Sequence, residues 1–202
     1  MNMITILLIA GRQANGPGLA AGSSYIAQLT RRLQADGLEP VVHLFRPFNL
    51  DEVSAWLAKQ PLMRYDLVIF QPDFGKLLAR KLRQQLSVVL GHLHPVRNRT
   101  FLLTPLPQRN RYFRRIRQRT ICLAVARVWG IPCFDTTDIL GSGEEFFQAD
   151  AREDLSAVAH ELLGSELYQA YHGLHDPSGP SLAVVLPAEV PAWRRYFTAA
   201  WR

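Results

Sequence analysis

Cysteine is scarce in this chain of 202 residues: Cys122 and Cys133 are its two thiols, and neither belongs to a CxxC pair. Few cysteines argue against a fold held by disulfides, and both thiols are expected to be reduced. The apolar run that ends at Gly11 is too short to span a membrane, and no positive charge precedes it as in a secretion signal. We therefore expect a cytoplasmic protein without a transmembrane segment.

Motifs for metals and nucleotides are also missing. The glycine-rich stretch from Gly11 to Gly18 lacks the Gly-Lys-Ser/Thr ending of a phosphate loop. Histidines occur in pairs at positions 92 and 94 and at positions 172 and 175, but neither pair has a full set of metal ligands near it in sequence. No metal site and no cofactor are therefore expected.

Acidic residues are outnumbered, since 23 Lys and Arg face 17 Asp and Glu, which gives a net charge of +6 and a pI near 9.7. Arginine supplies most of this charge. One cluster lies at the start of a predicted helix and consists of Arg109, Arg111, Arg114, Arg115, Arg117 and Arg119. Arginine interleaved with aromatic residues is typical of surfaces that bind anionic partners such as nucleic acid. A solvated helix surface that faces a protein partner is the other interpretation.

Short apolar runs alternate with amphipathic stretches along most of the chain. Strands are predicted at 3–10, 41–45, 66–70, 100–104 and 133–135, and helices follow each of them. The first run is typical of an inner strand buried on both faces, and the second is also expected to be buried. The alternation predicts a three-layer α/β/α sandwich around a parallel five-stranded sheet, because right-handed crossovers place helices on both faces.

The C-terminal stretch differs from the rest. We expect one domain over 1–180 and an extension over 181–202. Trp193, Phe197 and Trp201 recur every four residues, which is typical of one face of a helix. Such a stripe docks on the domain, or else it anchors the chain to a partner or a membrane surface.

Several segments together resemble the SGNH (GDSL-type) hydrolase superfamily. They follow the glycine loop after the first strand and read Tyr25-Ile-Ala-Gln-Leu, Asp66-Leu-Val-Ile-Phe, Phe101-Leu-Leu-Thr-Pro-Leu-Pro107, Gly130-Ile-Pro-Cys-Phe-Asp135 and Asp154-Leu-Ser-Ala-Val-Ala-His160. The resemblance implies a flavodoxin-like sandwich and an esterase or acyl hydrolase with a serine nucleophile.

The residues that carry this chemistry in the family are absent from the matching positions. Aligned on Gly11, the family's Asp and Ser correspond to Arg12 and Gln13, and the general base and its aspartate correspond to Asp154 and Ala151. The matching blocks Arg46-Pro-Phe-Asn49 and Gln71-Pro-Asp-Phe-Gly75 lack the Gly and the Gly-x-Asn-Asp pattern that supply oxyanion donors. His160 matches a histidine of the last helix that is not the catalytic base.

The polar residues at these positions still predict a ligand site at the carboxyl ends of the strands. The candidate ligand-binding residues are Gly11, Arg12, Gln13, Arg46, Asn49, Asp73, Asp150 and Asp154. Three of them, Asp154, Arg12 and Gln13, are also the candidates for any surviving catalysis. A simpler alternative is that Arg12 and Asp154 only pair with each other across a vacated pocket.

Three functions follow from these patterns. The first is a non-catalytic binding or scaffolding protein that uses the crevice or the arginine surface to hold a protein partner or an anionic small molecule. The second is an enzyme with a remodelled site, acting as an esterase, acyl hydrolase or acyl transferase. The third is nucleic-acid binding through the arginine cluster, which predicts a steep dependence of affinity on salt.

Overall fold

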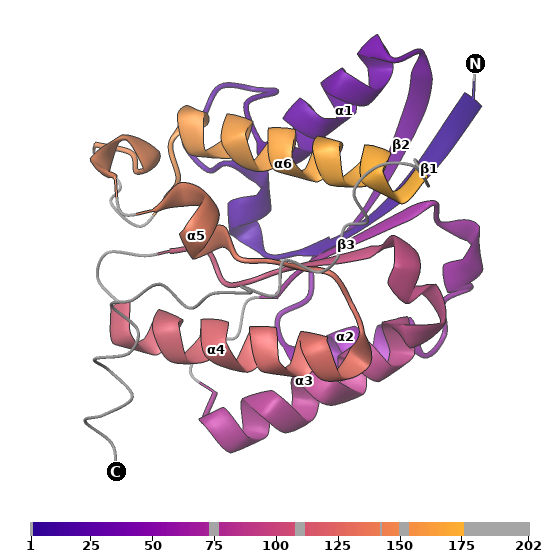
Figure 1. The fold of residues 1–202 in the computed structure, drawn as a ribbon, viewed down its shortest axis with the longest axis vertical. Coiled ribbons are helices and arrows are strands. Elements are labelled where there is room, and N and C mark those ends of the chain that lie inside the picture. Colours follow the sequence, from indigo (N-terminus) through magenta and orange to yellow (C-terminus); the bar gives the residue numbers. More distant parts are fainter. Residues whose placement is uncertain (1, 73–76, 108–111, 142, 150–153, 176–202) are drawn as a thin grey trace.

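The computed structural model describes residues 2–72, 77–107, 112–141, 143–149 and 154–175. Five strands form one parallel sheet in the order β2-β1-β3-β4-β5 (Figure 1). Their bounds are Asn2–Ala10 (β1), Leu38–Phe45 (β2), Leu67–Gln71 (β3), Thr100–Leu103 (β4) and Cys133–Phe134 (β5). The predicted five-stranded parallel sheet is therefore confirmed.

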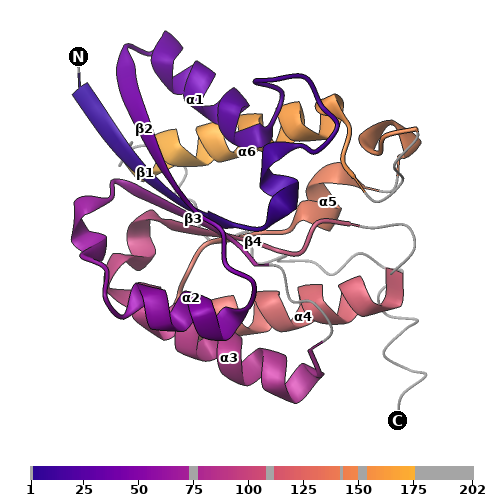
Figure 2. The same cartoon turned by 180° about the vertical axis from the view of Figure 1, so that it is seen from behind.

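Helices cover both faces of this sheet. They are α1 (Tyr25–Ala35), α2 (Leu50–Leu57), α3 (Ala79–Leu93), α4 (Tyr112–Trp129), α5 (Thr136–Leu140) and α6 (Ala157–His175). The described residues also contain four short 3-10 helices. One face carries α1 and α6, and the opposite face carries α2, α3 and α4 (Figures 1 and 2). This confirms the three-layer sandwich.

Strand β1 explains why the sheet needs both layers. Ile6 and Leu8 belong to the apolar cluster beneath α1 and α6, whereas Leu7 and Ile9 belong to the cluster beneath α2, α3 and α4. Successive side chains of a strand point to opposite faces, so an unbroken apolar run requires cover on both sides. The prediction of a doubly buried first strand is confirmed.

The helix starts follow the sequence signals. Ser24 caps α1 by accepting a hydrogen bond from the Ala27 amide at 3.3 Å. Asn49 caps α2 by accepting from the Glu52 amide at 2.9 Å, and the Glu52 carboxylate accepts from the Phe48 amide at 2.8 Å. A short polar side chain that satisfies an unpaired amide of the first turn stabilises a helix by about 1 kcal/mol.

One expectation needs correction. The second strand is longer than predicted and is not buried, because it lies at the edge of the sheet, where Val41 is 39% exposed. Between β5 and α6 the described chain forms α5 and the 3-10 helix Glu144–Phe146. The extension 181–202 and its aromatic stripe lie outside the described residues. In the part of the chain that is described, no helix is long and apolar enough to cross a membrane.

Candidate functional site

The candidate site lies at the carboxyl edge of the sheet, where β1 and β3 are neighbours. The chain leaves β1 towards α1 on one face and leaves β3 towards α3 on the other. Such a reversal of direction is where open α/β sheets bind their ligands. Strand β1 ends at Ala10, and Gly11 leads into the 3-10 helix Arg12–Asn15. The backbone of positions 11 to 13 therefore lies at the carboxyl end of β1, beside β3. The Arg12 and Gln13 side chains are outside the described set.

Gln148 joins the loop after β1 to the segment that precedes α6. Its side-chain amide donates to the Pro17 carbonyl at 2.8 Å and to the Leu155 carbonyl at 2.9 Å. Its backbone amide donates to the Asp154 carbonyl at 3.0 Å. The segments that carry positions 13 and 154 are therefore held at the same edge of the sheet.

A buried polar cluster lies beside this loop and consists of Tyr25, Gln71 and His160. The Tyr25 amide donates to Nδ1 of His160 at 3.1 Å, and the Tyr25 hydroxyl donates to Oε1 of Gln71 at 2.6 Å. The His160 ring stacks on the Tyr25 ring with centroids 5.8 Å apart. Three elements, α1, β3 and α6, are joined by these contacts.

Burial sets the protonation of this cluster. The His160 side chain is fully buried, which lowers its pKa to about 4, so the ring is neutral near pH 7. Since Nδ1 accepts from a backbone amide, the ring proton is on Nε2, which has no hydrogen-bond partner among the described residues. Burial also raises the pKa of the Tyr25 hydroxyl, which stays a donor.

The polar groups that follow β4 and β5 also bond to one another. The hydroxyls of Thr104 and Thr136 lie 3.0 Å apart, and the Thr136 amide donates to the Thr104 hydroxyl at 2.9 Å. Arg119 of α4 forms a two-pronged ion pair with Asp135 and reaches Asp138 at 2.6 Å. These contacts fix the β5–α5 turn against β4 and α4.

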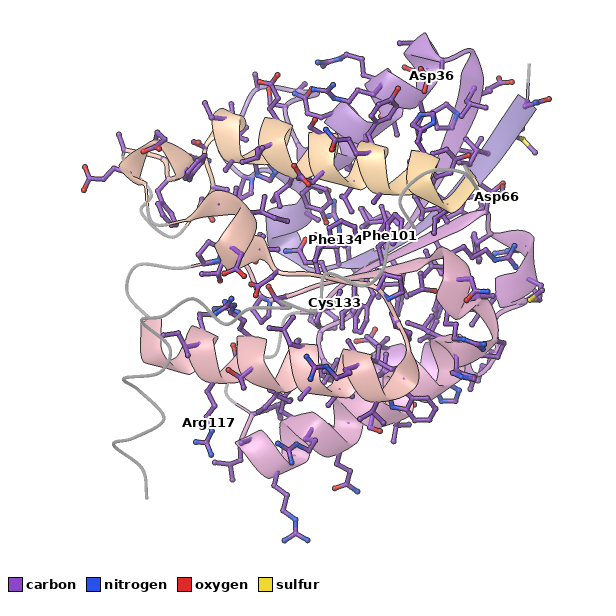
Figure 3. All side chains as sticks on the ribbon, viewed as in Figure 1. Asp36, Asp66, Phe101, Arg117, Cys133 and Phe134 are labelled. Atoms are coloured by element: carbon purple, nitrogen blue, oxygen red, sulfur yellow. The ribbon has the colours of Figure 1, made fainter. Side chains whose placement is uncertain are left out.

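Arg119 must therefore be removed from the predicted anion-binding surface. Its side chain is 11% exposed and that of Asp135 is 15% exposed. Two carboxylates already neutralise its guanidinium, so it is an internal ion-pair partner and not a surface charge. Arg117, two residues earlier, is exposed and projects from α4 away from the sheet (Figure 3).

The other predicted residues are placed as follows. The Arg46 side chain is exposed beyond β2, and the side-chain oxygen of Asn49 is used in the α2 cap. Asp154 is half-buried, and its backbone carbonyl accepts from Gln148. Arg115 donates to Gln118 at 3.4 Å. Outside the described residues or side chains lie Asp73, Asp150, Arg109, Arg111 and Arg114.

Metal binding finds no support in this geometry. No group of three or more His, Cys, Asp and Glu side chains is placed to hold a metal ion in the described ranges. Burial, and secondarily the nearby Asp135 carboxylate, raises the pKa of the Cys133 thiol. The thiol therefore stays protonated at neutral pH, which makes it a poor metal ligand and nucleophile.

Sequence reasoning missed the Tyr25–Gln71–His160 cluster and the role of Gln148. A partial signal exists for the cluster, because a glutamine at the end of the apolar run 67–70 needs a buried partner. Gln148 lies in a polar stretch where nothing distinguishes it from its neighbours. Its contacts depend on loops that are 131 and 7 residues away along the chain.

The fold has known counterparts among solved structures, although no family model and no curated protein sequence matches the chain significantly. A structure titled TesA is 19% identical, with a TM-score of 0.64, and the match covers 84% of this chain and 99% of that one. A putative lipolytic protein of the G-D-S-L family from Desulfitobacterium hafniense is 15% identical, with a TM-score of 0.64 over 82% of this chain and 98% of the other.

An acetylxylan esterase from Geobacillus stearothermophilus is 14% identical, with a TM-score of 0.65 over 83% of this chain and 94% of that enzyme. The chain therefore has the SGNH hydrolase fold, which confirms the fold predicted from the resemblance. At these identities the likeness concerns the fold alone.

Proposed function

We propose that this protein is a non-catalytic binding or scaffolding protein built on the SGNH hydrolase fold. Its ligand or partner is held at the carboxyl edge of the sheet, in the place of the hydrolase active site. The observation that carries the proposal is that the polar side chains at the ends of β3, β4 and β5 each have an internal partner. Gln71 bonds to Tyr25, Thr104 to Thr136, and Asp135 to Arg119.

These pairings leave little for serine-type chemistry to use. A hydroxyl nucleophile needs a base within hydrogen-bond reach, and each fixed oxyanion donor is worth roughly 3 to 4 kcal/mol in kcat. Position 13 carries a glutamine, whose amide is not a useful nucleophile, and position 154 carries an aspartate. The buried histidine of α6 is occupied by the Tyr25 amide. Retaining the framework without these groups supports binding as the function.

Labelling with a fluorophosphonate, measured by intact mass, tests this proposal. Acetyl, acyl and thioester substrates are assayed in parallel with the wild-type chain and with the variant Q13S. We expect neither an adduct nor turnover from the wild type. A stoichiometric adduct, or turnover that disappears when residues of the edge are replaced, would contradict a non-catalytic function.

A second variant series tests whether the fold still has the geometry of a hydrolase site. The combination Gln13→Ser, Ala151→Asp and Asp154→His restores the family's three side chains at the matching positions, and Gln13→Asn serves as its matched control. Labelling of the triple variant but not of the control would support the view that the scaffold retains a hydrolase geometry without the reactive groups.

The alternative is an enzyme with a remodelled site in which Asp154 acts as a base. The Gln148 contacts favour this alternative, because they keep the segment of Asp154 beside the loop after β1. A carboxylate can act as a general base where burial raises its pKa. If turnover is found, Asp154→Asn should abolish it and Glu145→Gln, a change on the same connection, should not.

A further inference from the structure

Three large apolar side chains are exposed at the starts of three neighbouring helices. Phe48 lies two residues before α2 and is 93% exposed, Leu78 directly precedes α3 and is 79% exposed, and Ile116 lies near the start of α4 and is 36% exposed. Single exposed apolar residues are common on protein surfaces. Their recurrence at three adjacent helix starts makes this group unusual.

The topology places these helix starts along one rim. Each of α2, α3 and α4 follows a parallel strand, so each begins at the carboxyl edge of the sheet. Helix α3 packs against both α2 and α4, and all three helices begin on the same side in Figure 2. Because packed helices are about 8 to 10 Å apart, the three apolar side chains are distributed along roughly 20 Å of this rim.

Exposed cations accompany the apolar residues. We call the whole group the edge patch, and its members are Phe48, Leu78, Ile116, Arg46, Arg80, Lys81 and Arg117. Neither α3 nor α4 contains a single Asp or Glu. The two acidic residues of α2 are engaged locally, since Asp51 accepts from Gln85 and Glu52 accepts from the Phe48 amide. The edge patch has four cations and no acidic member, so it is positively charged.

The position of these cations is unfavourable for the isolated domain. Positive charge in the first turn of a helix opposes the helix dipole, and the first turn of α3 contains Arg80 and Lys81. Exposed Phe and Leu side chains likewise gain nothing in water. An anionic surface with an apolar interior would offset both costs at once.

This combination distinguishes between two kinds of anionic partner. A single-stranded nucleic acid pairs with arginine and stacks its bases on aromatic rings, and the edge patch offers it one such ring, Phe48. The exposed Leu78 and Ile116 side chains offer no plane for stacking. A bilayer interface accepts both, because cations bind lipid phosphates while apolar side chains enter the acyl boundary.

We propose that the edge patch docks this protein on the surface of an anionic phospholipid membrane, beside the carboxyl edge of the sheet. The protein would lie on such a membrane without spanning it. Docking in this way brings the candidate site to the lipid headgroups. The proposal does not depend on whether the site is catalytic, since the edge patch lies outside the groups discussed for chemistry, except Arg46.

Co-sedimentation with lipid vesicles tests the proposal on the full chain. Vesicles of phosphatidylglycerol mixed with phosphatidylcholine are compared with vesicles of phosphatidylcholine alone, at low and high salt. We expect binding to the anionic vesicles, weakened by salt and absent with the neutral ones. No binding to the anionic vesicles at low salt would overturn the proposal.

Two double variants assign the binding to the edge patch. The change Phe48→Ser with Leu78→Ser should weaken the partition coefficient by at least about tenfold, because two apolar side chains no longer enter the interface. Ser at position 78 also suits the N-cap of α3, so the fold is preserved. The change Arg80→Glu with Lys81→Glu should weaken binding by more than about tenfold.

Matched controls place the same changes elsewhere. Lys59 and Arg127 lie in the same helical layer but at its opposite end, and both are exposed, so Lys59→Glu with Arg127→Glu conserves the change in net charge. Met3→Ser with Val128→Ser removes two exposed apolar side chains at the opposite end, since Met3 lies near the start of β1 and Val128 near the end of α4. Both controls should keep at least about half of the wild-type binding, since binding falls off with distance from the contacting face.

Three results would overturn the proposal. One is an equal loss of binding in the patch variants and in their controls. Another is binding that survives both patch variants but is lost on changing Trp193 and Trp201 to Ala, which would assign it to the C-terminal stretch. The third is tight, salt-sensitive binding of a single-stranded RNA oligonucleotide with no binding to vesicles, which would assign the rim to nucleic acid.

Discussion

The two helical layers that cover the sheet differ in how deeply their polar contacts are buried. Helices α1 and α6 share a buried contact, since His160 accepts from the Tyr25 amide, and an exposed pair in which Asp36 bonds to Tyr168 and His172. The polar contacts among α2, α3 and α4 are half-buried or exposed, and they are Ser54–His92, Asp51–Gln85 and Ser87–Trp129. These three helices also pack through Leu, Val and Ile side chains. Their outer surface carries the exposed cations and apolar residues of the edge patch.

This difference indicates where sequence change is tolerated. A buried directional contact fails when one atom is removed, so the Tyr25–His160 contact constrains individual residues of the layer of α1 and α6. Apolar packing constrains volume, and the outer face of such a layer is free to vary. We therefore expect a binding surface to arise more readily on the layer of α2, α3 and α4, and the internal geometry of the site to depend on the other layer.

Arg119 should be the exception within the layer of α2, α3 and α4, because it carries an internal ion pair. Replacing it by Gln leaves the mostly buried Asp135 carboxylate without its partner, and we expect a loss of about 3 kcal/mol in the free energy of unfolding. Arg117→Gln is the matched control, and its effect should be within about 0.5 kcal/mol because that side chain is exposed. Urea denaturation measures both, and equal effects would contradict the assignment of Arg119 to the interior.

His160 should make the opposite layer sensitive to acid. The pKa of His160 is about 4 in the folded protein, against 6.5 for an unperturbed histidine. Between pH 4 and pH 6.5 the ring is therefore protonated in the unfolded chain and mostly neutral in the folded one. The neutral His160 therefore contributes to the free energy of unfolding above pH 6.5. This contribution, about 2 to 3 kcal/mol, is lost as the pH falls towards 4.

Comparison with His160→Gln isolates this effect. Glutamine can still accept from the Tyr25 amide but does not titrate, so the difference between the unfolding free energies of the two proteins should shrink over this pH range. Carboxylates affect both proteins equally and cancel in the difference. A difference that stays constant from pH 7 to about pH 4 would exclude His160 as the titrating group.

Two helical glycines compare packing in the two layers directly. A Cβ at position 164 would lie 2.6 Å from Gln28 Cβ and 2.8 Å from the Tyr25 carbonyl oxygen, so Gly164→Ala must push α1 and α6 apart. We expect it to cost about 2 kcal/mol. Gly91→Ala in α3 would meet only the edge of the Trp129 ring at 3.2 Å. Because that ring can shift and alanine favours a helix, its effect should be within about 1 kcal/mol.

The same urea titration measures both variants. If Gly91→Ala unfolded at a clearly lower urea concentration than Gly164→Ala, the layer of α2, α3 and α4 would be the more tightly packed of the two.

The fold was predictable because local signals agreed with the global arrangement. The doubly apolar run of β1 required helices on both faces, and polar residues suited to capping, Ser24 and Asn49, precede two of the helices. The exposed edge position of β2 was not predictable, because Val41 to Phe45 reads like a buried run and only the strand order decides its neighbours.

The site was less predictable because its contacts are long-range. Arg119 looked like its exposed neighbours in sequence, and its ion pairs became apparent only when β5 placed Asp135 beside α4. Asn49 appeared both as a ligand candidate and as a helix cap, and the hydrogen bond to Glu52 explains its presence through the cap. The match of positions 13 and 154 to the family's catalytic residues stays a prediction from the motif.

The smallest expected effect concerns the Tyr25–Gln71 hydrogen bond, which joins α1 to the carboxyl end of β3. Tyr25→Phe removes the donor and leaves Oε1 of Gln71 buried without a partner, which should cost about 1 to 2 kcal/mol. In the double variant with Gln71→Met both polar atoms are gone, so it should cost less than the sum of the single changes by about 1 kcal/mol. Additive costs would mean that the two groups do not interact, and the edge of β3 would then have a polar group free to bind a ligand.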